Sequence, residues 1–287
     1  MTLRWVPGWN GLTEPEAVSY VAAVEAADGE PLEYGVARAI NDFVLGCKND
    51  GIWSAIKASC ILAGARTLNG ALVPLVGAAP TNYNFVSGDY NRSTGLVGDG
   101  STKYLDSNRD NNADPQYSNH NAVWLSNYTN SDQYLLGSGS GGGHNFLLAR
   151  TNAAFFRNRF NGGTESISAT GSGFSGGLFG VSRSPSSVQV TYRQASGQVY
   201  GSLSTPSLSP ASAPVLVFRQ GSAYSDVRLS FYSIGEALDL ALLDTRVTRL
   251  MNLITYTQTA GLPDLSTMDL DAAAYIGGAY RAGGTLS

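Results

Sequence analysis

The stretch Gly95-Leu96-Val97-Gly98-Asp99-Gly100-Ser101-Thr102-Lys103-Tyr104-Leu105 contains two short apolar runs separated by a turn of glycine and small polar residues. This punctuation predicts two neighbouring β-strands, Gly95–Val97 and Lys103–Leu105. The pattern continues on both sides, with turn residues at the spacing of about eight to twelve positions that is typical of all-β proteins. We therefore expect further strands at Ala71–Val76, Tyr83–Ser87, Ala122–Ser126, Gln133–Leu136, Asn145–Arg150, Ala153–Phe160, Leu178–Arg183, Ser187–Arg193, Gln198–Ser204, Val215–Arg219 and Arg228–Ile234.

Many short strands without helices between them predict a mainly β fold, a two-sheet sandwich or jelly roll. Helix-like sequence precedes and follows this region, so we divide the chain into four parts. Residues 1–13 form an irregular anchor peptide, 14–68 a small N-terminal helical module, 69–256 the β-sandwich with its closing C-terminal helix, and 257–287 a C-terminal tail. The glycine-rich run Ser138–Gly143 is expected to be a flexible hairpin tip, because no Gly-Lys-Ser/Thr follows it.

The helical module is predicted from caps and apolar spacing. Thr13 with Glu16 matches a capping box, so a first helix should start there and stop at Asp28-Gly29. A second helix should follow, weakened near Gly46, and a third is expected at Ile52–Ala63, with Gly64 as its stop. The apolar face of the second helix consists of Val36, Ala39, Ile40, Phe43 and Val44.

The C-terminal helix is expected to begin after Asp239, an N-cap residue. In the tail, Asp269–Ile276 resembles Glu14–Val21, which is either chance similarity between alanine-rich helices or a partial copy of the module that serves as a peg in an assembly. The anchor peptide carries Trp5 and Trp9, which either cover their own domain or dock on a neighbouring subunit. The apolar stripe of the closing helix consists of Leu240, Leu243, Val247, Leu250 and Ile254.

The composition excludes several partners. Charged residues make up 14% of the chain, against roughly 25% in an average soluble protein. The net charge is −4 and no basic run occurs, so nucleic acid is not an expected partner. No segment approaches the ~18–20 apolar residues of a membrane span, and no secretory leader opens the chain. We expect a protein made in the cytoplasm with Cys47 and Cys60 as free thiols, with a disulfide between them as the alternative.

The chain offers few groups for acid–base chemistry. A retaining glycosidase needs two carboxylates roughly 5 Å apart. The predicted β-region contains one glutamate, Glu165, in a Gly/Thr loop, and Glu236 follows beside a helix start, where the helix dipole favours an acid. His120 and His144 are expected at strand edges, and neither belongs to a metal-binding spacing. We therefore expect no catalytic residue, no metal ligand and no cofactor.

Two features indicate binding. Asp106–Asp114 is dense in oxygen ligands and opens like a calcium loop, but Asn111 and Tyr117 stand where that loop needs glycine and glutamate, so an Asx-rich turn is the simpler interpretation. The aromatic residues of the β-region are numerous enough for a sugar-stacking platform, although most should be core. They are Tyr83, Phe85, Tyr90, Tyr104, Trp124, Tyr128, Tyr134, Phe155, Phe156, Phe160, Tyr192 and Tyr200.

The predicted β-region opens with Phe85–Tyr90 and Thr94–Leu105, and it closes with Gly180–Arg183 and Phe231–Gly235 followed by a helix. These stretches resemble the laminin-G/concanavalin-A-like domains found in bacteriophage virion proteins. The run from Ala39 to Ala58 is similar to a module that precedes this domain in phage and prophage fibre or spike proteins. The resemblance covers residues 14–255.

The resemblance implies a concanavalin-A-like jelly roll and a place on a phage or phage-like particle. The tail fibre, a head decoration and a head spike, including that of a gene transfer agent, are all open. We expect a virion structural protein, not an enzyme, that presents a host-glycan-binding sandwich and attaches through its termini. Its expected partners are other virion proteins, a host surface polysaccharide and copies of itself. The alternatives are an adaptor for a separate receptor-binding protein and an envelope-polysaccharide hydrolase that uses Glu165.

Overall fold

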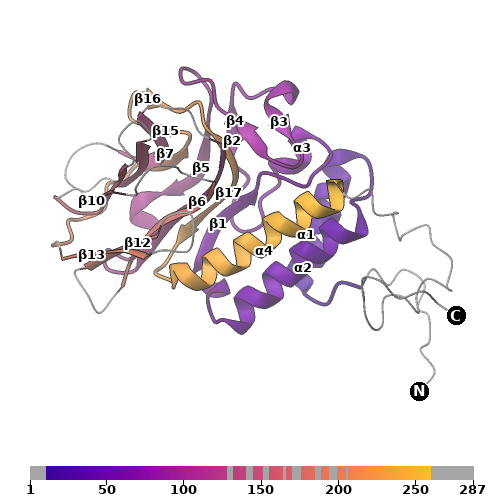
Figure 1. Ribbon diagram of the computed structural model, residues 1–287, viewed down its shortest axis with the longest axis horizontal. Helices are drawn as coiled ribbons and strands as arrows, with labels where there is room; N and C mark the ends of the chain where they lie inside the picture. The colour runs from indigo at the N-terminus through magenta and orange to yellow at the C-terminus, as the bar shows by residue number, and fades with distance from the viewer. Residues whose placement is uncertain are drawn as a thin grey trace, which may run out of the picture.

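The computed structural model describes residues 11–127, 132–139, 145–150, 155–163, 166–169, 176–184, 189–193, 199–204 and 206–259. It confirms a mainly β fold. Two large antiparallel sheets form a sandwich, and helices α1, α2 and α4 cover the outer face of one of them (Figure 1). Apolar residues from both sheets form one buried cluster between them, and a second cluster lies between the sheet and the helices.

The helix-covered sheet has eight strands. Seven follow the order β13-β12-β11-β6-β17-β4-β3, and β1 pairs with the edge of β17 beyond β4. The strands in chain order are β1 (Ile56–Ile61), β3 (Tyr90–Asn91), β4 (Gly95–Val97), β6 (Asn119–Asn127), β11 (Gly177–Arg183), β12 (Gln189–Arg193), β13 (Val199–Ser204) and β17 (Arg228–Gly235).

The second sheet has seven strands in the order β10-β9-β8-β7-β14-β5-β2, and a small hairpin, β15–β16, follows β14. The strands in chain order are β2 (Thr81–Tyr83), β5 (Tyr104–Asp110), β7 (Asp132–Ser138), β8 (Asn145–Arg150), β9 (Phe155–Phe160), β10 (Ser166–Ala169), β14 (Pro214–Val217), β15 (Arg219–Gln220) and β16 (Ala223–Tyr224).

Strand β6 shows how the eight-stranded, helix-covered sheet is buried on both faces. Val123 and Leu125 point into the sandwich interior, whereas Ala122 and Trp124 face the helices. This is the alternation of a strand, with a period of two, applied to a sheet that is covered on both sides. The helices that cover this sheet therefore contribute to the hydrophobic core.

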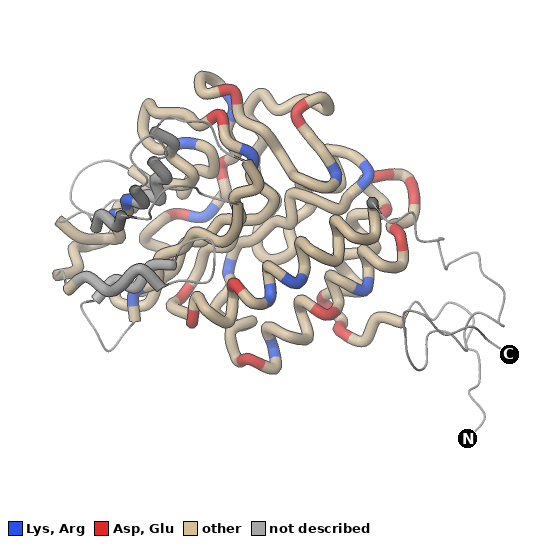
Figure 2. Tube along the Cα trace, in the orientation of Figure 1, with Lys and Arg blue, Asp and Glu red and all other residues tan. Residues whose placement is uncertain are grey.

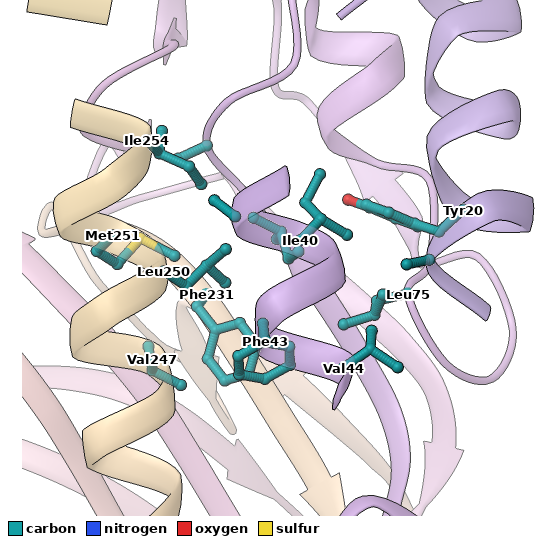
Figure 3. Packing of buried hydrophobic residues seen from close by; sticks show 14 of the residues in the cluster. Tyr20, Ile40, Phe43, Val44, Leu75, Phe231, Val247, Leu250, Met251 and Ile254 are labelled. Carbon is teal, nitrogen blue, oxygen red and sulfur yellow. The ribbon is translucent and has the colours of Figure 1, made fainter. Parts of the chain in front are cut away.

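The three long helices are α1 (Pro15–Asp28), α2 (Tyr34–Asn49) and α4 (Leu240–Thr259). The predicted cap of α4 is confirmed, since Asp239 Oδ1 accepts the N–H of Ala241 at 2.7 Å. The whole predicted stripe of this helix is buried. Figure 3 shows Val247, Leu250, Met251 and Ile254 of α4 packed toward Phe43 of α2 and Phe231 of β17.

Two helix boundaries differ from the prediction. The Thr13 cap is wrong, because α1 begins at Pro15 and the N–H groups of Thr13 and Glu14 donate instead to Asn41 Oδ1, at 2.7 and 3.0 Å. Helix α2 continues past Gly46 to Asn49. At Gly46 the missing side chain leaves room for Arg246 of α4, so the glycine serves packing rather than helix termination.

The predicted helix Ile52–Ala63 is wrong. Its residues form a 3₁₀ turn, η1 (Trp53–Ala55), and then strand β1. Pairing with β17 decides the conformation, because Ser59 Oγ also donates to the carbonyl of Tyr232 at 2.7 Å and a helix would leave that strand edge unpaired. The non-local sheet contact overrides an apolar spacing that a helix also satisfies.

Several strand predictions also differ. Ala71–Val76 is not a strand: a short helix, α3 (Leu68–Ala71), ends there, and Val76 makes one isolated bridge to Ser59. Tyr83–Ser87 is a strand only up to Tyr83, because Asn84 has φ of 68° and the 3₁₀ turn η2 (Ser87–Asp89) follows. The strand predicted at Lys103–Leu105 extends to Asp110, where η3 (Asn111–Ala113) begins.

Several predictions fall on residues that the structure does not describe. These are Trp5 and Trp9 of the anchor peptide, residues 140–143 of the hairpin tip, and residues 260–287, which include nearly all of the tail. The division into an anchor, a module, a sandwich and a tail stays a prediction. Figure 2 shows acidic and basic residues along α1, α2 and α4. No helix within the described part of the chain is long and apolar enough to cross a membrane.

Candidate functional site

The two tyrosines that end β2 and begin β5 lie directly opposite each other. Tyr83 and Tyr104 are register partners, and their rings stack at 4.3 Å between centroids with only 5° between the ring planes. Cross-strand neighbours on one face of a sheet are close enough for this contact. Tyr83 is 39% exposed, so one face of its ring rests on Tyr104 while the rest meets solvent.

The hairpin β15–β16 extends this pair into a longer stack. The Arg219 guanidinium carbon lies 4.5 Å from the ring centroid of Tyr104 and 4.7 Å from that of Tyr224. Arg219 and Tyr224 are register partners in the hairpin, and Arg219 Nε donates to the carbonyl of Gly221 at 2.7 Å. We call Tyr83, Tyr104, Arg219 and Tyr224 the tyrosine stack. The Tyr104 and Tyr224 rings lie edge to face at 6.0 Å, and the one cation contacts both, an attractive arrangement.

The pKa of Tyr104 is raised because partial burial disfavours the phenolate, although the positive charge of Arg219 opposes this effect. Tyr104 is therefore a neutral phenol at ordinary pH. The stack offers ring faces and hydrogen-bonding hydroxyls, and it offers no general base.

The turn before β5 holds Tyr104 in place. Asp99 Oδ1 accepts the N–H groups of Ser101, Thr102 and Lys103 at 2.9, 2.7 and 3.0 Å. Burial raises the pKa of Asp99, but these hydrogen bonds and that from the Thr102 hydroxyl outweigh it and bring the pKa below its usual range. The G-D-G-S-T-K-Y-L run is thus explained locally: its aspartate organises the turn and its tyrosine enters the stack.

The loop after β2 is fixed to this turn. Asn82 holds the backbone of Phe85 through two hydrogen bonds of 3.0 Å, one to its N–H and one from its own Nδ2 to the carbonyl. Phe85 itself is 4% exposed and packs its ring 5.1 Å from that of Phe218. Asn84 Nδ2 donates to the carbonyl of Thr102 at 3.0 Å, so the loop and the turn are joined.

An aromatic ring with one open face and a surrounding set of hydroxyl and amide groups is suited to a sugar. The C–H face of a pyranose packs on such a ring, while its hydroxyls need hydrogen-bonding partners at the edge. Asn84, Ser101 and Thr102 are exposed; Asn84 directly follows Tyr83, and its amide donates to the carbonyl of Thr102. The chemistry of this surface therefore suits a neutral, amphipathic ligand.

The structure places the other predicted residues elsewhere. Phe85 and Phe160 are core, and Tyr90 and Trp124 pack against the core clusters. Tyr128 lies outside the described residues. Only the backbones of Phe155, Phe156, Tyr192 and Tyr200 are described. Tyr134 is partly buried. Of the aromatic candidates whose side chains are described, Tyr83 and Tyr104 are the two that join the stack.

His120 was expected at a strand edge. It lies instead within β6, where it is fully buried. Its Nδ1 donates to the carbonyl of Glu236 at 2.5 Å, and its Nε2 accepts from the Ser233 hydroxyl at 2.8 Å. Burial lowers its pKa to about 4. This neutral imidazole joins β6 to the segment before α4. His144 lies outside the described residues.

Of the two glutamates considered for hydrolysis, one is paired with a lysine and the other is not described. Glu236 forms an ion pair with Lys57, at 2.8 Å, and Glu165 lies outside the described part. The segment Asp106–Asp114 is divided between β5 and η3, and Arg109 binds Asp114 through two contacts, at 3.0 and 2.6 Å. No group of three His, Cys, Asp or Glu side chains arranged for a metal ion occurs in the described residues. The two cysteines are free and buried, as predicted, and burial raises the pKa of both thiols to about 12.

Sequence reasoning missed Arg219 and Tyr224. The run Arg219-Gln220-Gly221-Ser222-Ala223-Tyr224 does contain a hairpin signal, a central Gly-Ser between two short segments. That signal could have located the hairpin. It could not have placed the hairpin against Tyr104.

No known family matches the sequence, and no curated protein matches it. Among solved structures, the chain is similar to the botulinum neurotoxin serotype D binding domain, with a TM-score of 0.48 and 8% identity over 68% of this chain and 50% of that chain. It is also similar to Trypanosoma rangeli sialidase in complex with 2,3-difluorosialic acid, with a TM-score of 0.44 and 11% identity over 79% of this chain and 40% of that one. The chain thus spans half or less of the length of these structures. At these TM-scores the likeness carries no argument about function.

Proposed function

We propose that this protein is a glycan-binding β-sandwich protein without enzymatic activity, and that the tyrosine stack is the centre of its binding surface. The observation that carries the proposal is the partly exposed Tyr83, stacked on Tyr104 and followed by the exposed Asn84, which is bonded to the exposed turn residue Thr102. A stack that served only to close the end of the sandwich would not need its outer ring to be 39% exposed. Glu236 supports the absence of hydrolysis, because its carboxylate is paired with Lys57.

On the resemblance of Thr94–Leu105 to phage virion domains, we also propose that the protein is part of a phage or phage-like particle. The ends of the described chain support attachment through the termini. Gly11 lies against Tyr34, and Thr257 lies against Gly35, so both ends of the described chain lie near the start of α2. Hairpin β15–β16 lies on the other side of the molecule (Figure 1). Attachment at one side and display of the stack at the other are therefore compatible.

The experiment measures binding of the full-length chain to a panel of purified bacterial surface polysaccharides. We expect wild-type protein to bind at least one of them, and Tyr83→Ala to weaken that binding about tenfold through loss of the stacking face. Tyr117→Ala is the matched control, since Tyr117 is an exposed tyrosine outside the stack, and it should bind like wild type. Thermal unfolding confirms that both variants are folded. Absence of binding across the panel, or equal binding by Tyr83→Ala, would overturn the proposal.

A further inference from the structure

Arg219, the cation of the tyrosine stack, has no carboxylate partner in the described part of the chain. Its side chain contacts the rings of Tyr104 and Tyr224, and its Nε donates to the carbonyl of Gly221 at 2.7 Å. Its positive charge is therefore not neutralised by the protein. Other arginines in the described residues each form an ion pair with Asp or Glu: Arg38, Arg66, Arg92, Arg109, Arg246 and Arg249.

The unused donors of Arg219 are at the outer end of the guanidinium. Stacking on an aromatic ring engages the flat face of a guanidinium and leaves its N–H edge available. Nε is used by Gly221, whereas Nη1 and Nη2 have no acceptor in the described part of the chain, and neither is buried. Two such nitrogens form a planar donor fork that matches the two oxygens of a carboxylate.

The backbone on both sides of Arg219 is fixed before any ligand binds. Phe218, which precedes it, is fully buried, and its N–H donates to the carbonyl of Leu135 at 2.9 Å. Gln220, which follows it, donates from Nε2 to the carbonyl of Gly139 at 3.0 Å. Because the hairpin and the stack already hold Arg219, little conformational entropy is lost when an anion binds.

The stack offers a single positive charge. Lys103, the other cation next to Tyr104, is neutralised by Asp89 at 2.6 Å, and this ion pair is largely shielded from solvent, with 19% and 13% of the two side chains exposed. One unpaired guanidinium is suited to a monoanion such as a carboxylate. Phosphate groups, with up to two negative charges, are more often bound by clusters of cations.

The free charge lies close to the proposed sugar-stacking ring. Tyr83 and Arg219 both contact Tyr104, at 4.3 and 4.5 Å, so the Tyr83 ring centroid and the guanidinium carbon are separated by no more than the sum of these distances. Adjacent sugars of one glycan chain can reach both groups.

We propose that the ligand of the tyrosine stack is an acidic glycan and that Arg219 is a specificity-determining residue that binds the carboxylate of a uronic acid. This inference rests on the proposed glycan binding at the same surface. Tyr83 contacts the neutral ring of one sugar, and the Nη groups of Arg219 bind the carboxylate of that sugar or of its neighbour. The carboxylate supplies the charge that the protein does not provide for Arg219.

The test compares acidic polysaccharides with their own carboxyl-reduced forms, using the full-length protein at about 0.15 M salt. The probes are alginate and hyaluronan, each before and after reduction of its uronic acids to the neutral hexoses, and dextran sulfate. We expect at least one uronate polymer to bind about tenfold more tightly than its reduced form, the gain of a hydrogen-bonded charge pair. The net charge of −4 repels polyanions in general, so this preference would report a local contact.

The diagnostic variant is Arg219→Gln, and the readout is the ratio of the two affinities. Loss of stacking should weaken the acidic and the reduced polymer equally, whereas loss of the charge should bring their ratio to about one. Arg219→Lys keeps the charge without the donor fork and should keep a reduced preference, about threefold. Arg249→Gln is the matched control, since Arg249 is 62% exposed on α4, and it should keep the wild-type ratio. Thermal unfolding checks that each variant is folded.

The outcomes separate this inference from the proposed function. Equal binding of the acidic and reduced forms, or a preference that survives Arg219→Gln, overturns the role of Arg219 and leaves glycan binding standing. Dextran sulfate that competes as well as the uronate polymer would overturn the assignment of a carboxylate. If neither these polymers nor the panel of bacterial polysaccharides bind, the proposed function fails as well.

Discussion

The guanidinium of Arg219 lies 4.5 Å from the ring centroid of Tyr104, and it joins hairpin β15–β16 to the edge of the seven-stranded sheet. The same guanidinium lies 4.7 Å from the ring of Tyr224. Tyr104 in turn stacks on Tyr83, so the position of the Tyr83 ring depends indirectly on Arg219.

Arg219→Ala should lower the free energy of unfolding by roughly 1–2 kcal/mol, since two cation–π contacts are lost. It should also weaken polysaccharide binding, because Tyr104 loses the group on its second side. Urea unfolding measures the first effect. Arg249→Ala is the control: Arg249 is 62% exposed and pairs only with Asp42 among the ion pairs described, at 3.1 Å, so its loss should cost less than about 1 kcal/mol and leave binding unchanged. Equal effects of the two substitutions would contradict the role of Arg219.

Gly95→Ala should destabilise the fold by at least about 2 kcal/mol. Gly95 has φ of 90°, and a Cβ there would lie 2.1 Å from the carbonyl oxygen of Leu229, which is backbone and cannot rotate away. Gly88→Ala is the matched control in the preceding turn, because nothing lies within 4 Å of its Cβ position. The shift in thermal midpoint should be several degrees for the first variant and near zero for the second. Similar midpoints would contradict the close packing of β4 on β17.

Asp99→Ala should lower the free energy of unfolding by roughly 1–3 kcal/mol, because three backbone N–H groups lose their acceptor. The folded pKa of Asp99 is depressed, so its contribution is fully present above the unfolded value of about 3.9 and is lost progressively as the pH falls from there toward the folded pKa. Asp110→Ala is the control, since the exposed Asp110 makes no side-chain cap at η3. Urea unfolding at pH 7 and pH 3 should show a smaller difference between the variants at the lower pH.

The buried His120 predicts a pH-dependent stability. Burial depresses its folded pKa to about 4, against about 6.5 when unfolded, so the unfolded chain binds the extra proton first. The free energy of unfolding should therefore be highest above pH 6.5 and fall by about 3 kcal/mol toward pH 4. His120→Gln should be less stable at pH 7, but its stability should fall less between these pH values. An unchanged pH slope in the variant would show that other groups cause it.

The sequence was sufficient where local chemistry decides the structure. Asp239 and the stripe from Leu240 to Ile254 predicted α4, and period-two runs predicted β4, β6, β11 and β17 in place. The sequence was insufficient where a segment distant in the chain determines the secondary structure. The run Ile52–Ala63 has spacing that suits a helix, and only the free edge of β17 makes it a strand.

The same distinction between local signals and distant contacts applies to the candidate site. Tyr83 and Tyr104 were among the aromatic candidates because alternation exposes some of them, but their stacking follows from the register of β2 on β5. Arg219 and Tyr224 join them through a hairpin whose position depends on the sheet edge. The sequence placed His120 at a strand edge. Its burial could not be predicted, because that requires knowledge of which face of the sheet α4 covers.

The most direct measurement records the ring signals of ¹³C-labelled tyrosines in the full-length protein during addition of a bound polysaccharide fragment. Tyr83 is assigned from Tyr83→Phe. The signals of Tyr83 and Tyr104 should shift in proportion to occupancy, and those of Tyr117 and Tyr256, two exposed tyrosines outside the stack, should stay in place. Shifts confined to other tyrosines, with Tyr83 unaffected at saturation, would contradict glycan binding at the tyrosine stack.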